Sequence, residues 1–359
     1  MNMRSVIFKA VVFLFLSHNA SGKNYDWLLI YYMPYDNNLS PLSQNIIHQI
    51  AKDGRSNNIC VTLQVDRAGN GGMSRYSFNS KVDSMNIDEE ESASSKVFDA
   101  YLGWVSKNFK AKHYSIILLN HGGELNEYGL DEYPRTQWLQ IDSLAISIQK
   151  FNLLEGISKI DLLFEQVCSR GTIENLYEFR DVAMFTLASQ DLVPAPGYYY
   201  SKVFSDIKTG KINSGDKLAD LIVNNERDDM YYSFTLVENS KWKDWQKLLE
   251  MHSLSLNDPN TKINQDNFKI VSYGGVTYFD FISLINSVST PSQDGLIKDF
   301  TNQVLIKRLY VNKNSERMMG YSGLSVCSPF KIPHSALSIY SLRAYQNFLS
   351  SLGSLARKE

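Results

Sequence analysis

Cys168 and His121 are the residues of this 359-residue sequence whose types and positions could do covalent chemistry. A cysteine thiolate is a strong nucleophile, and a nearby histidine can take the thiol proton and pass it to a leaving amine. Each residue follows an apolar run that ends abruptly in polar or glycine residues. The pair therefore indicates nucleophilic attack on a carbonyl group.

Two predicted strands would position this pair. The run from Ile160 to Phe164 precedes Cys168 and is typical of a strand buried on both faces of a parallel sheet. A similar run from His113 to Asn120 precedes His121. Ligands of open α/β sheets bind beyond the carboxyl ends of parallel strands, so both side chains are expected at one edge of the sheet.

Simpler interpretations of both residues remain open. His121 could merely cap a turn, and Cys168 could be a buried cysteine at the start of a helix. The remaining cysteines, Cys60 and Cys327, lie within apolar runs and are predicted to be small core residues. Cys168 differs from them in its polar sequence neighbours, and the odd number of cysteines implies at least one free thiol.

Five short segments carry a resemblance when they are taken in order. They are Asp36 to Leu39, Asn120 to Gly123, Phe164 to Cys168, Ala188 to Asp191, and Tyr321 to Ser325. In this order they resemble the motifs of the clostripain family of caspase-like cysteine peptidases. The resemblance spans about residues 26 to 349. It implies an endopeptidase that cleaves protein or peptide substrates, with Cys168 as nucleophile and His121 as general base.

Glycines after the histidine have a further use in similar peptidases. The N–H of Gly122 or Gly123, together with that of Cys168, is expected to form an oxyanion hole. Gly122 is the preferred candidate. A tight turn that needs positive φ is the simpler explanation of the glycines, and the two are compatible.

Substrate preference is where the sequence departs from the family pattern. Relatives that cleave after Arg or Lys typically have an acidic residue two positions before the nucleophile, whereas this chain has Gln166. A neutral amide cannot balance a buried guanidinium. Asp191 or Asp36 could supply the charge, and the resemblance places Asn37 or Asn38 beside the same cleft. Cleavage after basic residues is therefore one hypothesis, and an acidic or neutral preference is the alternative.

The resemblance to the clostripain family also bears on maturation and on cofactors. Such peptidases commonly cut themselves between the histidine and cysteine strands, where Arg135, Lys150 and Lys159 are the basic candidates. Calcium dependence is not universal in the family. The acidic run from Asp88 to Glu91 lacks calcium-ligand spacing, so no cofactor is expected.

Composition limits the compartment and the partners. A net charge of −2 without a basic stripe gives no reason to expect nucleic acid binding. Arg4 and Lys9, the apolar run from Ala10 to Leu16 and small residues follow one another as in a secretory signal. Residues 1–22 are thus predicted to be a signal peptide, although a buried N-terminal strand is possible. The run is too short for stable membrane insertion, and the mature chain is expected to be secreted, periplasmic or on the cell surface.

The predicted architecture is a caspase-like α/β fold, with a mainly parallel sheet flanked by helices on both faces. Residues 23–200 are expected to form the catalytic domain, and residues 201–359 a helical or mixed part that completes this domain or packs on it. The expected elements include a loop from Leu125 to Arg135, a helix from Trp138 to Phe151, a helical stretch from Tyr198 to Met251, and a helix from about Tyr278. The alternative hypothesis is a secreted binding or scaffold protein that has lost proteolysis, and it is motivated by Gln166 in place of an acidic residue.

Overall fold

A computed structural model describes residues 24–69, 72–88, 91–227, 230, 233–273, 276–289, 304–311, 320–328 and 337–356. The predicted signal peptide and residues 89 and 90 of the acidic run lie outside the described residues. Within these ranges, none of the helices combines the length and the apolar character needed to cross a bilayer.

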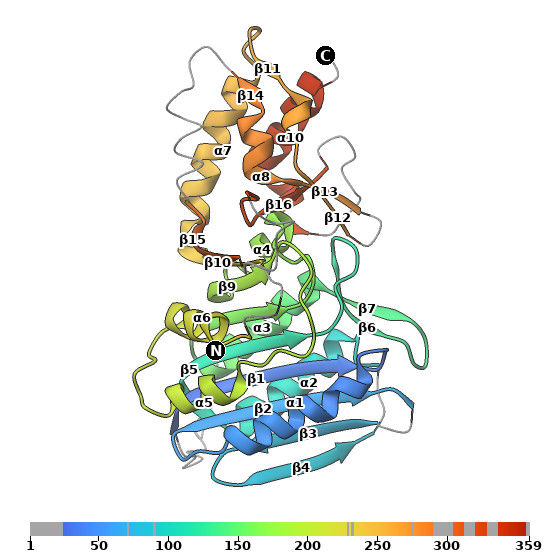
Figure 1. The fold of residues 1–359 in the computed structure, drawn as a ribbon, viewed down its shortest axis with the longest axis vertical. Coiled ribbons are helices and arrows are strands. Elements are labelled where there is room, and N and C mark those ends of the chain that lie inside the picture. Colours follow the sequence, from blue (N-terminus) through green and yellow to red (C-terminus); the bar gives the residue numbers. More distant parts are fainter. Residues whose placement is uncertain are drawn as a thin grey trace, which may run out of the picture.

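A large mixed sheet organises the molecule (Figure 1). In the described part of the chain it has nine strands in the order β15-β10-β9-β8-β5-β1-β2-β3-β4. The strands from β9 to β2 run parallel, and antiparallel strands close both edges. The strands are β1 (Asn24–Tyr35), β2 (Ile59–Arg67), β3 (Met73–Phe78), β4 (Val82–Ile87), β5 (Lys110–Leu119), β8 (Ile160–Gln166), β9 (Ala183–Ser189), β10 (Ser233–Glu238) and β15 (Ile306–Val311).

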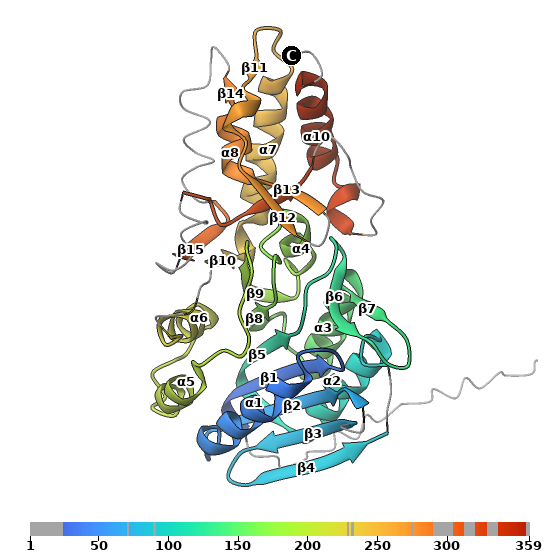
Figure 2. The same cartoon turned by 45° about the vertical axis from the view of Figure 1, so that its right-hand side comes forward.

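Helices cover both faces of this sheet, because its central strands are apolar on both sides. Alternate residues of β1 face opposite cores: Leu29 and Tyr31 pack with α1, α5 and α6, whereas Leu28 and Ile30 pack with α2, α3 and α4. The two helix groups lie on opposite sides of the sheet in Figure 2. These helices are α1 (Ser40–Asp53), α2 (Ser95–Asn108), α3 (Ile141–Glu155), α4 (Ile173–Glu178), α5 (Tyr200–Ile207) and α6 (Gly215–Asn224).

The described residues within 242–289 and 320–356 form a second lobe, which we call the C-terminal module. It lies beyond the end of the sheet that contains β9, β10 and β15 in both views, and α4 lies between it and the central strands (Figures 1 and 2). Its larger elements are α7 (Trp242–Leu256), β12 (Ile270–Tyr273), β13 (Val276–Asp280), α8 (Phe281–Asn286), β16 (Ser325–Cys327) and α10 (Arg343–Ala356).

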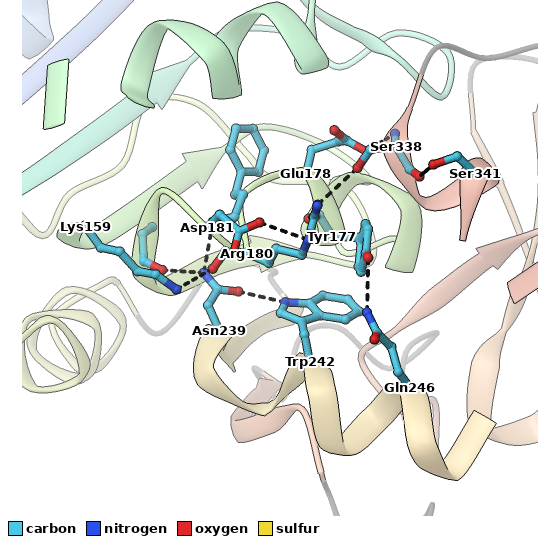
Figure 3. A network of polar contacts seen from close by, with 12 residues as sticks. Lys159, Tyr177, Glu178, Arg180, Asp181, Asn239, Trp242, Gln246, Ser338 and Ser341 are labelled. Atoms are coloured by element: carbon cyan, nitrogen blue, oxygen red, sulfur yellow. Dashed lines mark hydrogen bonds and ion pairs between the residues drawn. The ribbon is translucent and has the colours of Figure 1, made fainter. Parts of the chain in front are cut away.

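Polar contacts join α4 to the C-terminal module (Figure 3). The hydroxyl of Tyr177 accepts a hydrogen bond of 3.1 Å from Gln246 of α7. Arg180 donates to the hydroxyl of Ser338 at 3.0 Å. Nearby, Trp242 donates to Asn239 at 3.0 Å, and Asn239 in turn donates to the carbonyl of Ala183 at 3.0 Å. Side-chain hydrogen bonds therefore link the C-terminal module to α4 and to β9.

Three boundaries expected from the sequence are wrong. The predicted loop from Leu125 to Arg135 contains β6 (Glu127–Asp131), which forms a hairpin with β7 (Gln137–Gln140), so the crossover helix begins at Ile141 rather than Trp138. The stretch from Tyr198 to Met251 is interrupted by β10, which pairs with β9. The segment at Tyr278 belongs to β13, and α8 begins only at Phe281. In each case, pairing with a distant partner overrides the local pattern.

Candidate active site

Strand register brings the predicted pair to one edge of the sheet. Strands β5 and β8 are adjacent and parallel, and Leu119 lies opposite Gln166 in their register. His121 and Cys168 each follow two residues after this matched pair. Both side chains therefore leave the sheet at the same level, at the carboxyl ends of neighbouring strands.

His121 is held through one ring nitrogen. Its Nε2 lies 2.6 Å from Oδ1 of Asn38, in the turn after β1. Because an amide oxygen only accepts hydrogen bonds, Nε2 carries the hydrogen and Nδ1 keeps the lone pair of the neutral ring. Burial lowers the pKa of His121, although the carboxylate of Glu132 acts in the opposite direction. The imidazole is thus neutral near pH 7 and able to accept a proton.

Cys168 sits on a sharp turn after β8. The following residue, Ser169, has φ 53°, a conformation that non-glycine residues seldom adopt. Its N–H is fixed by the carbonyl of Asp191 at 2.9 Å. The sulfur of Cys168 accepts a hydrogen bond from the N–H of Val193 at 3.4 Å. This turn points the thiol away from the strand and toward the loop after β9.

The thiol and the imidazole are both neutral in this arrangement. Burial raises the pKa of Cys168, while the hydrogen bond from the N–H of Val193 and the nearby hydroxyl of Tyr273 lower it. Among the described residues, no hydrogen bond joins His121 to Cys168, since the histidine bonds Asn38 instead. Such a pair would not rest as a thiolate–imidazolium ion pair. Proton transfer would instead accompany attack on a bound substrate.

Two backbone N–H groups beside the thiol are suited to binding an oxyanion. Within the described part of the chain, no acceptor takes a hydrogen bond from the N–H of Gly122 or of Cys168. The N–H of Gly123, in contrast, donates to the carbonyl of Glu127 at 3.1 Å. Of the two glycines considered from the sequence, Gly122 is the one with an available donor.

Close approach of the two loops explains why position 122 is a glycine. A Cβ atom there would lie 2.4 Å from the carbonyl oxygen of Cys168. Arg170 connects the same two loops, because its buried guanidinium donates hydrogen bonds to the carbonyls of Glu127 at 2.8 Å and Gly123 at 3.0 Å. Its Nε also donates to the carbonyl of Cys168 at 3.3 Å. The histidine and cysteine loops are therefore positioned as one unit.

Gln166 lies on the same side of β8 as Cys168, next to a carboxylate that sequence reasoning missed. Its Oε1 accepts a hydrogen bond from the hydroxyl of Tyr199 at 3.2 Å. A Cβ on Gly197 would lie 2.7 Å from Nε2 of Gln166 and 3.0 Å from Oε2 of Glu226. Gln166 and Glu226 thus flank the same backbone position. Glu226 follows α6 and carries no sequence signal that links it to the cysteine.

Three further acidic residues near the site, among them Asp191 and Asp36, have other surroundings. Glu165 faces away from Gln166 and accepts a hydrogen bond from Asn175 at 2.8 Å; burial raises its pKa to about 8. Asp191 is buried after β9, and its carbonyl fixes the turn at Ser169. Asp36 is buried in a cluster with two other carboxyl groups.

That cluster, Asp36, Asp66 and Asp131, could bring carboxylate oxygens together around a metal ion. One oxygen from each lies within 4.8 Å of the others. Hard oxygen donors of this kind suit calcium. However, both oxygens of Asp131 already accept hydrogen bonds, from Ser92 at 3.0 Å and from the N–H of Tyr133 at 3.2 Å. Burial raises the pKa of Asp36 and of Asp131, and the absence of a cofactor stays a prediction.

Solved structures share the fold of this chain. The chain is similar to a secreted C11 cysteine protease from Bacteroides thetaiotaomicron in complex with an irreversible peptide inhibitor, with a TM-score of 0.67 and 13% identity over 91% of this chain and 99% of that one. It is also similar to an inactive zymogen C11 protease from Parabacteroides distasonis, with a TM-score of 0.64 and 16% identity over 90% and 98% of the two chains. The fold is the caspase-like α/β fold of cysteine peptidases, as predicted.

The family follows from the sequence itself. The model of the clostripain family matches residues 31–265, and the chain belongs to this family. Clostripain from Hathewaya histolytica is 27% identical over 239 residues, and the match covers 54% of this chain and 44% of clostripain. The chain thus matches less than half the length of this curated relative.

Proposed function

We propose that this chain is a cysteine endopeptidase in which Cys168 is the nucleophile and His121 the general base. The observation that carries the proposal is the matched register of β5 and β8, which delivers both side chains to one sheet edge beside two unengaged N–H groups. Membership of the clostripain family supports the same reaction. Asn38 then positions the imidazole through Nε2 rather than binding substrate directly.

The proposed reaction proceeds through a thioester. His121 takes the proton of the thiol as the sulfur attacks the scissile carbonyl carbon. The N–H groups of Gly122 and Cys168 bind the negative oxygen of the tetrahedral intermediate. The imidazolium then protonates the leaving amine, the C–N bond breaks, and an acyl-cysteine remains. Water, deprotonated by His121, hydrolyses the thioester and restores the thiol.

Selective alkylation tests this function. Incubating the protein with a small electrophile such as iodoacetamide near pH 7 should label Cys168 ahead of Cys60 and Cys327. Both of these are buried, and burial raises the pKa of each to about 12. Peptide mapping identifies the labelled residue, and Cys168→Ala is the control that should lose the label. Equal or absent labelling of the three cysteines would favour the binding or scaffold protein instead.

We further propose that the enzyme prefers a basic residue before the scissile bond and that Glu226 supplies the charge. Glu226 takes the place of the missing acidic residue at position 166, because it flanks Gly197 together with Gln166. Its Oε1 is fixed by the N–H of Tyr198 at 2.6 Å. A carboxylate that is held in this way can pair with a guanidinium or ammonium group.

A Glu226→Gln variant should therefore lose its preference for Arg over norleucine before the cleaved bond. We expect kcat/KM for the Arg peptide to fall about tenfold to a hundredfold, because one charge-assisted contact is lost. Activity on the norleucine peptide should change little. Glu250→Gln removes the same charge from an exposed position of α7 and is the matched control. A wild-type preference for acidic or neutral residues would contradict the assignment.

Self-processing, if it follows the family pattern, is proposed at Arg135. This residue is exposed in the turn between β6 and β7, whereas Lys150 lies within α3. The ammonium of Lys159 is held by the carbonyl of Arg180 at 2.6 Å. Peptidases bind their substrates in an extended conformation, and an exposed turn can adopt this conformation more easily than a helix can. Cleavage is therefore expected in the turn. Purified protein should split into two fragments over time, and Arg135→Gln and Cys168→Ala should each remain a single band, while Lys150→Gln is still cut.

Export from the cytoplasm completes the proposal. The sequence pattern of residues 1–22 supports a cleaved signal peptide, and the similar protease from Bacteroides thetaiotaomicron is described as secreted. N-terminal sequencing of the mature protein would locate the cut, which we expect after Ala20 or Gly22.

A further inference from the structure

The β12–β13 hairpin of the C-terminal module reaches the cysteine side of the candidate active site. The hydroxyl of Tyr273, in β12, donates a hydrogen bond of 2.9 Å to the carbonyl oxygen of Gly122. The same hydroxyl lies near enough to the Cys168 thiol to lower the pKa of that thiol. Tyr273 lies beyond residues 31–265, the segment that the family model matches. One side chain of the C-terminal module thus lies beside the proposed nucleophile and bonds Gly122, the proposed oxyanion-hole residue.

The hairpin is anchored on both sides of the cysteine loop. Strand β13 pairs with β16, and the N–H of Ser325 in β16 donates to the carbonyl of Gly171 at 2.8 Å. Gln190, after β9, donates to the hydroxyl of Ser325 and to Asp280 of β13, each at 3.0 Å. These buried contacts fix the position of the hairpin relative to Cys168.

The hydroxyl of Tyr273 has one proton to donate and two possible acceptors. A carbonyl oxygen is a better acceptor than the sulfur of a neutral thiol, which accounts for the bond to Gly122. A thiolate is charged and therefore the stronger acceptor of the two. Loss of the thiol proton would thus redirect the hydroxyl from the carbonyl of Gly122 to the sulfur of Cys168.

We propose that Tyr273 is a further catalytic residue, whose hydroxyl turns from the Gly122 carbonyl to the Cys168 sulfur as that thiol gives its proton to His121. This inference rests on the proposed peptidase function. Tyr273 keeps its own proton throughout, the thiol proton moves to the imidazole as sulfur attacks the substrate, and the hydroxyl stabilises the negative charge that develops on sulfur in this step. The N–H of Val193, 3.4 Å from the sulfur, is the second donor to the thiolate.

Removing the Tyr273 hydroxyl would leave the charged groups around the Cys168 sulfur unchanged. Arg170 lowers the pKa of Cys168, and Asp191 raises it. His121 and Tyr273 are the remaining titratable groups of the arrangement described here. A Tyr273→Phe substitution leaves all of them except Tyr273 in place. It therefore isolates the effect of a single hydroxyl group.

The pH dependence of Cys168 alkylation tests the proposal. In full-length Tyr273→Phe protein, we expect the apparent pKa of Cys168 to rise by about one unit, so that alkylation near pH 7 slows about tenfold. For peptide hydrolysis, kcat should fall while KM changes little. Tyr278→Phe is the matched control: it removes a hydroxyl from β13 of the same hairpin, one that has no hydrogen-bond partner among the described residues.

An unchanged pKa of Cys168 in Tyr273→Phe would overturn the proposal, because the hydroxyl would then have no effect on the thiol. Faster alkylation of this variant would also overturn it, because the hydroxyl would then only restrict access to the thiol. Failure of the underlying function gives a different result. In that case, Cys168 of the wild type would itself be no more reactive than Cys60 and Cys327. The wild-type measurement therefore separates the two failures before any variant is compared.

Discussion

An alanine at position 121 should lower kcat/KM for peptide hydrolysis by about a thousandfold. Without the imidazole, no group in the described site can take the thiol proton and later give it to the leaving amine, and general acid–base catalysis of this kind contributes about 10²–10⁴ in rate. Binding of substrate does not need the imidazole, so the loss should appear in kcat rather than KM. Steady-state kinetics with a fluorogenic peptide measure both.

His113→Ala is the matched control for this experiment. His113 belongs to the same strand, β5, but lies at its other end, where Nδ1 is 2.9 Å from Asp161. Removing it should leave kcat/KM within a few-fold of the wild type. Equal losses in the two variants would show that the effect at position 121 comes from disturbance of β5 and not from lost proton transfer.

A methyl group at position 122 should have nearly as large an effect. In Gly122→Ala, the new Cβ would lie 2.4 Å from the carbonyl oxygen of Cys168, so the histidine and cysteine loops must separate. Separation misaligns the two N–H groups proposed to bind the oxyanion, and loss of such a donor costs about 10²–10³ in kcat. We expect a loss of that order in the hydrolysis of peptides.

Gly103→Ala provides the comparison. Gly103 lies in α2, nothing lies within 4 Å of a Cβ built on it, and alanine favours a helix. This variant should keep full activity and an equal or higher Tm. Thermal unfolding of Gly122→Ala should be measured alongside, since a folded but inactive protein is the expected result. If a folded Gly122→Ala variant kept the kcat of the wild type, Gly122 would have no role in the oxyanion hole.

The placement of His121 and Cys168 at one edge of the sheet could be predicted from sequence because it depends on two short patterns. Each apolar run ends in a chemically distinctive residue, and parallel strands always present their carboxyl ends to the same edge. His121 and Cys168 therefore need no knowledge of distant contacts. The fold class follows from the same alternation of buried strands and helices.

Other parts of the site depend on contacts that no local pattern encodes. Glu226 and Tyr273 reach the site from separate segments far along the chain, and neither has a neighbouring residue that suggests chemistry. The buried role of Arg170 was hidden for another reason: a charged residue in a turn is usually solvated, whereas here backbone carbonyls replace the solvent. The strand β10 was missed because its pairing partner is distant in sequence.

The continuation of the sheet through β10 and β15 also bears on how this enzyme can be divided. A chain that stops near residue 200 would contain every residue of the proposed proton-transfer pair, yet β9 would become an open edge. Unpaired edges with apolar faces are templates for aggregation. Residues up to 200 are therefore expected to need the later strands in order to fold, and a shortened enzyme would require a replacement for β10 along the edge of β9.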